Sequence, residues 1–227
     1  MTLSRSIILG GILLSSLIIA NAQGTFQNLD FESGSLVLIP GDFNHRYYFA
    51  DAFPGWTGYA GADQISAISY NDFPLAAASI SLLSIDGGLG DNVIAGRFTP
   101  LIHAGAQSGS FVEASIAQVG TLPKDAAFLD FKAQTGSLGL LASFAGQNLT
   151  LSAIDSGVNY TLYQADISAF AGQLGELRFT APTSPINPYN GFFLDSITFL
   201  PVPEPSTLVL FAAAGVLGCF ILPRRGS

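Results

Sequence analysis

Acidic side chains are the most frequent ionisable groups in this chain, because its 227 residues include sixteen Asp and Glu but only two His and one Cys. Two carboxylates facing each other about 5 to 10 Å apart would suffice for glycoside hydrolysis, but sequence spacing does not supply that distance. The chain has no Gly-x-Ser-x-Gly, Gly-Lys-Ser/Thr or His-Glu-x-x-His motif. His45 and His103 are far apart in sequence, and we expect each to be an ordinary surface or strand residue. We therefore predict a protein that is not an enzyme, and keep a glycoside hydrolase as an alternative.

One carboxylate has an unusual sequence context. Asp195 lies in Phe193-Leu194-Asp195-Ser196-Ile197-Thr198-Phe199, and strict alternation along a strand puts it in phase with Phe193, Ile197 and Phe199 on the apolar face. A carboxylate buried on that face needs a compensating partner. Two partners are compatible with the sequence: a calcium ion bound through oxygen ligands, or backbone N–H groups that donate hydrogen bonds to the carboxylate.

Trp56 is the only tryptophan, and it lies in Pro54-Gly55-Trp56-Thr57-Gly58-Tyr59. A loop of this composition can present Trp56 and Tyr59 as flat faces for a sugar ring. A single large aromatic side chain is also a common component of a protein core. The sequence leaves both interpretations open: a ligand-binding pair, or a core tryptophan.

The central part of the chain is acidic. Four charged residues belong to the two ends, namely Arg5, Glu204, Arg224 and Arg225, which leaves fifteen acidic and five basic residues between 23 and 200. The resulting net charge of −10 repels phosphate backbones. We therefore expect no nucleic-acid partner.

Residues 1–22 have the pattern of a cleavable signal peptide. Arg5 precedes an uncharged apolar stretch over residues 7–19, and Ala20-Asn21-Ala22 is a small-x-small cleavage pattern. As a helix, thirteen apolar residues would be about 20 Å long, whereas the hydrocarbon core of a bilayer is about 30 Å thick. This favours cleavage after Ala22 over retention as an anchor, so we predict an exported protein that begins at Gln23.

Residues 201–227 form a second distinctive end. Pro203-Glu204-Pro205 is followed by the uncharged residues 207–222 and then by Arg224-Arg225. Sixteen residues make a helix about 24 Å long, which can span a bilayer if the membrane thins or the arginines snorkel. Because flanking arginines favour the cytoplasmic side, this single transmembrane helix would place the preceding domain on the opposite side.

The order of a Pro-Glu-Pro triad, one short apolar helix and a terminal arginine pair resembles the bacterial PEP-CTERM sorting signal, and residues 203–225 carry the resemblance. Such a tail is also named an ice-binding protein C-terminal domain, although this chain lacks the regularly spaced Thr ranks of an ice-binding face. The resemblance implies that an exosortase-type protease recognises the triad and removes the helix. The protein would then pass from an inner-membrane-anchored intermediate to the cell surface or extracellular matrix, whereas a plain membrane anchor is the alternative.

The body of the chain, residues 23–200, reads as one domain of short strands. Apolar and polar residues alternate most clearly at 127–133, 149–153 and 177–179. Further candidate strands, separated by Gly, Pro, Asn and Asp clusters, are 28–32, 35–39, 45–50, 64–70, 79–84, 93–98, 110–118, 138–144, 159–163 and 192–199. A short helix is expected at 165–172, with Asp166 as its cap. So many strands in one domain predict an all-β fold, a β-sandwich.

The body also resembles jelly-roll carbohydrate-binding modules, and the segments that carry the resemblance are residues 28–32, 54–59 and 193–199. It implies a jelly-roll-like β-sandwich with a structural calcium where the last strand meets the first, so that Asp30 and Glu32 would join Asp195 as ligands. The predicted function is a non-catalytic surface or matrix protein associated with extracellular polysaccharide. The alternatives are a secreted lectin-like module and a glycoside hydrolase.

Overall fold

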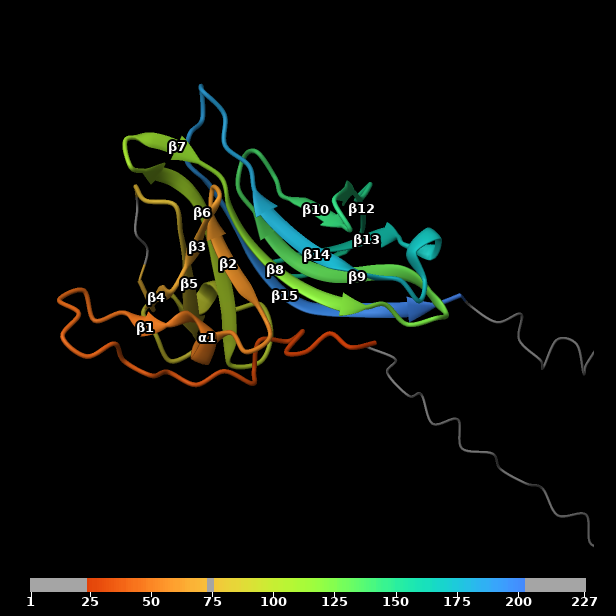
Figure 1. The fold of residues 1–227 in the computed structure, drawn as a ribbon, viewed down its shortest axis with the longest axis horizontal. Coiled ribbons are helices and arrows are strands. Elements are labelled where there is room, and N and C mark those ends of the chain that lie inside the picture. The colour runs from red at the N-terminus through yellow and green to blue at the C-terminus, as the bar shows by residue number, and fades with distance from the viewer. Residues whose placement is uncertain (1–23, 73–75, 203–227) are drawn as a thin grey trace, which may run out of the picture.

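The protein folds into two facing β-sheets, as a computed structural model shows for residues 24–72 and 76–202 (Figure 1). The nine-stranded sheet has the spatial order β1 (Tyr47–Tyr48), β4 (Ala67–Tyr70), β5 (Ser79–Ser84), β6 (Phe98–Gln107), β15 (Asn190–Pro201), β9 (Ala126–Thr135), β13 (Thr161–Asp166) and β12 (Ser152–Ser156), with β7 (Ser110–Val112) paired to β6. The six-stranded sheet has the order β11 (Gln147–Asn148), β10 (Leu141–Phe144), β14 (Leu174–Ala181), β8 (Ala114–Thr121), β2 (Thr57–Ala60) and β3 (Asp63–Ile65). The prediction of an all-β sandwich is confirmed.

Helices contribute little to the described part of the chain. α1 (Phe49–Ala52), η1 (Gly90–Asn92) and η2 (Ser168–Phe170) are each a single turn. Asp166 accepts hydrogen bonds from the backbone N–H and hydroxyl of Ser168, but the N-cap position of η2 is Ile167, so Asp166 lies one residue before the cap and the helix is shorter than predicted. Within the described residues, no helix has the length and apolar character needed to cross a membrane. The predicted signal peptide (1–22) and transmembrane helix (207–222) lie outside these residues.

The core lies between the sheets and is built by period-two alternation. On the central strands of the nine-stranded sheet, Ile102, Ala104, Phe192, Leu194 and Ala133 are all fully buried. Their sequence neighbours point away from the core, because successive side chains on a strand face opposite sides of the sheet. The nine-stranded sheet therefore has a distinct outer face, which is important for the sites described below.

The alternation predicted the interior strands better than the edges. The strands at 127–133, 177–179 and 79–84 are confirmed as parts of β9, β14 and β5. The prediction at 149–153 is wrong over 149–151, which form no strand between β11 and β12. The strands predicted at 28–32, 35–39 and 93–98 are also wrong: 28–32 form turns, 35–39 are irregular apart from one isolated bridge at Leu38, and 93–97 are a loop before β6.

The central strand β6 was missed beyond its first residue. Its sequence, Phe98-Thr99-Pro100-Leu101-Ile102-His103-Ala104-Gly105-Ala106-Gln107, contains Pro100 and Gly105, two residues that disfavour a strand interior. It is nevertheless buried between β5 and β15, so burial outweighs the local preferences.

Candidate functional site

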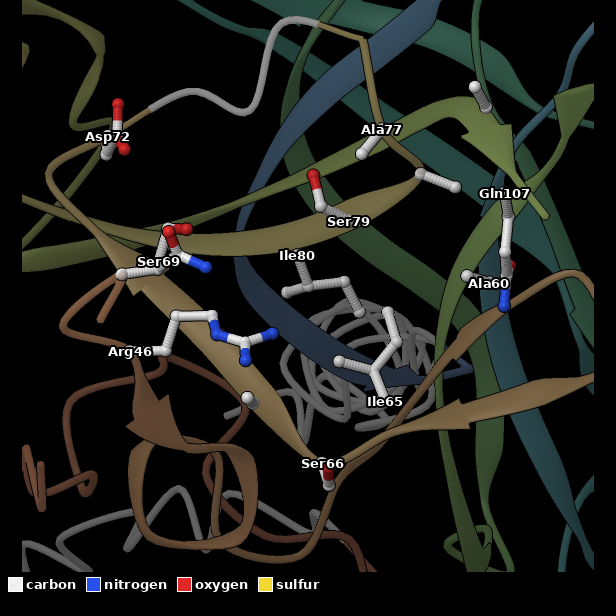
Figure 2. A pocket seen from close by; sticks show the side chains of 14 residues that line it. Arg46, Ala60, Ile65, Ser66, Ser69, Asp72, Ala77, Ser79, Ile80 and Gln107 are labelled. Atoms are coloured by element: carbon white, nitrogen blue, oxygen red, sulfur yellow. The ribbon is translucent and has the colours of Figure 1, made fainter. Parts of the chain in front are cut away.

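A pocket in the described part of the fold lies where β4 and β5 separate. These two strands run parallel and pair at Ser69↔Ser81 and Tyr70↔Leu82. Before these pairs the strands diverge and leave a pocket of 610 Å³ between them and the β2–β3 hairpin (Figure 2). It is lined by Asn44, Arg46, Ala60, Ile65, Ser66, Ala67, Ser69, Asp72, Ala77, Ala78, Ser79, Ile80, Ala106 and Gln107. This volume is in the range of pockets that hold small ligands.

Arg46 supplies the cationic group of this pocket. The turn before it is closed by the backbone N–H of His45, which donates to Asp42 O, and the Asp42 carboxylate also accepts from Asn44 N at 2.8 Å. Arg46 Nε donates to Asp42 Oδ2 at 2.7 Å, and this pairing orients the guanidinium toward the cavity, as Figure 2 shows. The terminal Nη atoms of Arg46 form no ion pair or hydrogen bond with the described residues. Four N–H donors are thus available to oxygen atoms of a ligand.

Two uncharged oxygen atoms in the same wall lack partners. Gln107 Nε2 donates to Asp63 Oδ2 at 2.9 Å, whereas Gln107 Oε1 is buried and accepts no hydrogen bond within the described chain. Ser79 Oγ is in the same situation. A buried polar atom without a partner costs about 1 to 3 kcal/mol, so both atoms would gain from a hydroxyl-bearing ligand or water. Asp72 is the one carboxylate among the lining residues.

This pocket was not predictable from the sequence, because its lining comes from six separate segments and consists mainly of Ala and Ser. The binding pair predicted from the sequence, Trp56 with Tyr59, does not line this pocket. Trp56 is 5% exposed, packs against Phe31 and Phe179 with tilted rings, and donates from Nε1 to Asn28 O at 3.0 Å. The prediction that Trp56 presents its face to a sugar is therefore wrong, and the alternative of a core tryptophan is confirmed.

Tyr59 lies on the opposite side of the sheet from Trp56. It is half-buried on the outer face of β2, with the Arg178 guanidinium 4.4 Å from its ring centroid. Arg178 in turn donates to Glu176 and to Ser115 Oγ. The two aromatic residues do not form one binding surface.

Asp195 is buried, as predicted, but on the other face of its strand. Ser196 has a φ of 50°, and the pairing register shifts between Asp195 and Thr198. This β-bulge breaks the alternation, so that Ile197 and Phe199 point into the core while Asp195 stays on the outer side with Thr99. The assignment of Asp195 to the core face is wrong because alternation assumed a regular strand.

Asp195 is held by hydrogen bonds from the loop before β6, from β6 and from its own strand β15. Oδ2 accepts from Thr99 Oγ1 at 2.6 Å and from Ala95 N at 3.2 Å, while Oδ1 accepts from Ser196 N at 2.6 Å. Burial raises the pKa of the Asp195 carboxyl to about 6, although the hydrogen bonds from Thr99, Ser196 and Ala95 act in the opposite direction. The prediction that backbone N–H groups are its partners agrees with this geometry.

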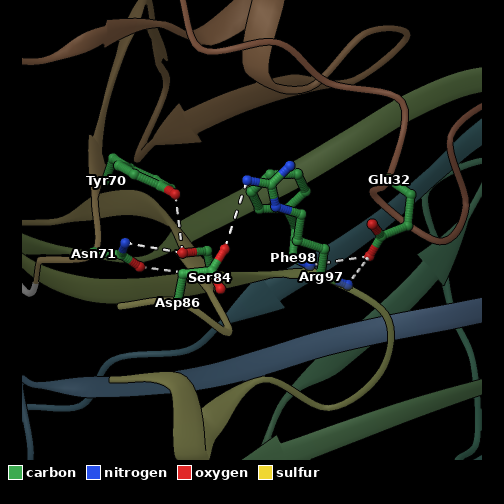
Figure 3. Close-up of polar contacts among 7 residues, drawn as sticks. All are labelled: Glu32, Tyr70, Asn71, Ser84, Asp86, Arg97 and Phe98. Carbon is green, nitrogen blue, oxygen red and sulfur yellow. Dashed lines mark hydrogen bonds and ion pairs between the residues drawn. The ribbon is translucent and has the colours of Figure 1, made fainter. Parts of the chain in front are cut away.

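Glu32 holds the same loop from the other side. Its Oε1 accepts from Arg97 N at 2.8 Å and Phe98 N at 3.0 Å, and Arg97 pairs with Asp86 at 3.6 Å (Figure 3). Nearby, Ser84 Oγ accepts hydrogen bonds from the Tyr70 hydroxyl and from Asn71 Nδ2, and Ser84 N donates to Asn71 Oδ1. The first segment does meet the last strand, since Ile197 N donates to Leu29 O at 3.0 Å.

The calcium site predicted at Asp195, Asp30 and Glu32 has no geometric support in the part of the chain that the structure describes. No group of three His, Cys, Asp or Glu there is arranged to hold a metal ion. Asp30 Oδ1 accepts from Glu32 N at 3.3 Å, and the other two carboxylates face N–H and O–H donors, which repel a cation. Calcium binding stays an untested prediction.

The histidines occupy the ordinary positions that were predicted. His45 lies in an exposed turn, and His103 lies on the outer face of β6, where Nδ1 is 3.3 Å from Ala77 O. The two histidines are far apart in sequence, and His45 is not among the residues that line a pocket with His103.

Comparison with solved structures gives distant likenesses. TmCBM61, solved in complex with beta-1,4-galactotriose, has 12% sequence identity and a TM-score of 0.44, and the match covers 79% of this chain and 99% of that chain. The enzymatically active domain of tailspike protein 4 from bacteriophage CBA120 has 15% identity and a TM-score of 0.37, covering 66% of this chain and 20% of that chain. None of the curated proteins compared with this chain matches it.

The comparison with protein families gives a specific result for the end of the chain. Residues 201–225 match the PEP-CTERM protein-sorting motif. This confirms the resemblance found in the order of Pro203-Glu204-Pro205, the apolar stretch and the arginine pair. In general, this motif implies export and sorting to the cell surface. The chain is thus a β-sandwich protein that carries a PEP-CTERM sorting motif at its C-terminal end.

Proposed function

We propose that this protein is a non-catalytic component of the cell surface or extracellular matrix, and that its sandwich binds polysaccharide through the pocket between β4 and β5. The observation that carries the proposal is the composition of the pocket wall. Arg46 offers unpaired N–H donors, Asp72 offers a carboxylate, and Ser79 and Gln107 offer buried oxygens without partners. Sugar hydroxyls both donate and accept hydrogen bonds, so they match such a mixed wall.

The same lining supports the proposal of binding without hydrolysis. Glycoside hydrolysis commonly uses two facing carboxylates, and Asp72 is the one acidic residue among the fourteen that line the pocket. Two further acids are bonded to lining residues: Asp42 accepts a hydrogen bond from Arg46 Nε, and Asp63 accepts one from Gln107 Nε2. We therefore assign this pocket to recognition.

Delivery to the surface would depend on the two ends of the chain. In this proposal the signal peptide is removed after Ala22, helix 207–222 holds the protein in the inner membrane, and an exosortase-type protease then acts at Pro203-Glu204-Pro205. The match of residues 201–225 to the sorting motif supports this route. The processed protein then reaches the outer surface, where polysaccharide is available.

The test is binding of the purified full chain, in detergent micelles, to fragments of the host's extracellular polysaccharide. Arg46→Gln should weaken binding about tenfold, because hydrogen bonds from a charged donor contribute about 1.5 to 3 kcal/mol. Arg97→Gln is the matched control, since Arg97 has the same charge and pairs with Asp86 away from the pocket. Equal loss in both variants, or no binding by the wild type, would refute the pocket assignment.

A further inference from the structure

A second hollow lies on the outer face of the nine-stranded sheet. It has a volume of 410 Å³, and its lining includes Asn92, Leu101, His103, Gln134, Gly191 and Phe193. The buried neighbours of these residues in sequence, such as Ile102 and Phe192, point into the core. This hollow, called here the sheet groove, is therefore separated from the core by the sheet itself.

The sheet groove differs chemically from the first pocket. None of its lining residues carries a formal charge at neutral pH with His neutral, and Leu101 with Phe193 gives it an apolar side. Gln134 Oε1 is buried and has no hydrogen-bond partner within the described chain. His103 Nδ1 lies near Ala77 O, and because a carbonyl only accepts, Nδ1 carries the proton in that hydrogen bond and leaves Nε2 as an acceptor. An apolar side with a few amide and imidazole groups suits an uncharged sugar unit better than a charged one.

The strand register connects the sheet groove to the first pocket. Ser79, in the wall of the first pocket, pairs with His103, which in turn pairs with Gly191. Paired residues on neighbouring strands place their side chains on the same face. Ala77, which accepts the hydrogen bond of His103, also lines the first pocket. The two hollows thus share one boundary, the start of β5.

A second row of paired residues gives the distance across the sheet from β5 to β9. Ser81 pairs with Leu101, Leu101 with Phe193, and Phe193 with Gln134. Three steps between strands cover about 14 Å, which is longer than one sugar ring. Ser81 Oγ and Gln134 Oε1, at the two ends of this row, are both buried without a partner in the described residues. Ser81 is fully buried and lines neither hollow, so this row supplies the distance across the sheet, and Gln134 is the unsatisfied acceptor that lines the sheet groove.

We propose that the first pocket and the sheet groove are two subsites for one polysaccharide chain, with an uncharged sugar unit in the sheet groove. The proposal rests on the proposed function, since it assumes that the first pocket binds a saccharide. It specifies the ligand as a chain of several units that crosses β5, β6, β15 and β9. A single sugar would fill one subsite and leave the other without a ligand.

The test compares two size fractions of the host's extracellular polysaccharide, fragments of one or two sugar units and fragments of six or more, by calorimetry with the full chain in detergent. The wild type should bind the long fragments about tenfold more tightly, the equivalent of one added hydrogen-bonded contact of about 1.4 kcal/mol. Gln134→Ala should remove this advantage, so that long and short fragments bind the variant with about the same affinity. Gln147→Ala is the matched control, because Gln147 is exposed on β11 of the other sheet.

The outcomes separate this inference from the proposed function. Equal affinity for short and long fragments, or a Gln134→Ala variant that keeps the advantage, overturns the two-subsite proposal while the first pocket stands. Absence of binding to either fraction overturns both. If Gln134→Ala does not fold, as judged by Trp56 fluorescence, His103→Asn replaces it, since an Asn side chain keeps a donor for Ala77 O while removing the imidazole. The same loss of the long-fragment advantage is then expected.

Discussion

The buried carboxylate of Asp195 makes the stability of this protein depend on pH in a defined direction. Its pKa is raised from 3.8 to about 6 in the folded protein, chiefly by burial. A folded-state pKa above the unfolded value means that the folded protein holds the proton more tightly. The stabilisation from this proton is complete below about pH 4 and is lost as the pH rises through 6.

The magnitude follows from the size of the shift. The pKa rises by about two units, and each unit corresponds to 1.36 kcal/mol, so ionisation of Asp195 should lower the free energy of unfolding by about 3 kcal/mol between pH 4 and pH 7. This conversion applies because the side chain is 1% exposed, where solvent screening is weak. A surface carboxylate would not justify it.

The assay is denaturant unfolding of the full chain in detergent, followed by fluorescence of Trp56, the only tryptophan and a core residue. Asp195→Asn removes the titrating group, so the wild type should lose about 3 kcal/mol more than the variant between pH 4 and pH 7. The free energy of unfolding of the variant should also be lower by about 1 to 3 kcal/mol at every pH. The reason is that its NH₂ group would face an N–H or O–H group that donates a hydrogen bond to the carboxylate in the wild type. Parallel pH profiles for the two proteins would refute the reasoning.

Removal of metal ions is the necessary control for this measurement. We expect EDTA to leave the melting temperature of the wild type unchanged, because both oxygens of Asp195 already accept hydrogen bonds from protein donors. A lower melting temperature in EDTA, absent from an Asp195→Ala variant, would instead support calcium at this carboxylate.

Three further predictions concern the loop that covers Asp195 and the two ends of the chain. Gly96→Ala should lower the free energy of unfolding, measured with denaturant, by about 1 to 2 kcal/mol more than Gly139→Ala does. Both glycines have positive φ, but a Cβ at Gly96 would collide with Glu32 Oε1, whereas a Cβ at Gly139 would meet open space. N-terminal sequencing of the exported protein should find Gln23, and detection of Met1 would exclude cleavage. In the native host, Glu204→Ala should leave full-length protein in the membrane while the wild type is released; retention of both would favour a plain anchor.

How far the sequence predicted this structure depends on the regularity of each segment. β9 and β14 follow strict alternation and were predicted, because one face of each packs on the core and alternation records that packing. β6 was missed because it contains Pro100 and Gly105 and because most of its residues are buried, so its sequence shows no clear alternation. Asp195 was placed on the wrong face because one residue with positive φ, Ser196, shifts the phase of the strand beyond it. Local sequence contains no signal for either effect.

The candidate site was less predictable than the fold for a related reason. Aromatic residues and carboxylates were the candidate site residues predicted from the sequence. Trp56, however, packs in the core, and Asp195 accepts a hydrogen bond from the loop before β6. The pocket depends on where β4 and β5 cease to pair, and its wall consists of Ala and Ser with Arg46 and Gln107 brought from distant segments. Such a site depends on strand register, which a single sequence does not determine.

The position of the tail relative to the pocket bears on when binding can begin. β15 leads from Asn190, which pairs with Ala104 near the pocket wall, to Pro201, which pairs with Ala126 at the opposite end of the molecule (Figure 1). Twelve residues of strand span about 35 Å, so the chain leaves the sandwich about that far from the pocket. A helix at 207–222 would therefore hold the tail end toward the membrane and leave the pocket accessible. We expect the membrane-retained Glu204→Ala protein to bind polysaccharide fragments with the same affinity as the released wild type. A tenfold or larger loss in the retained protein would show that the tail or the membrane covers the pocket, and that processing controls binding as well as location.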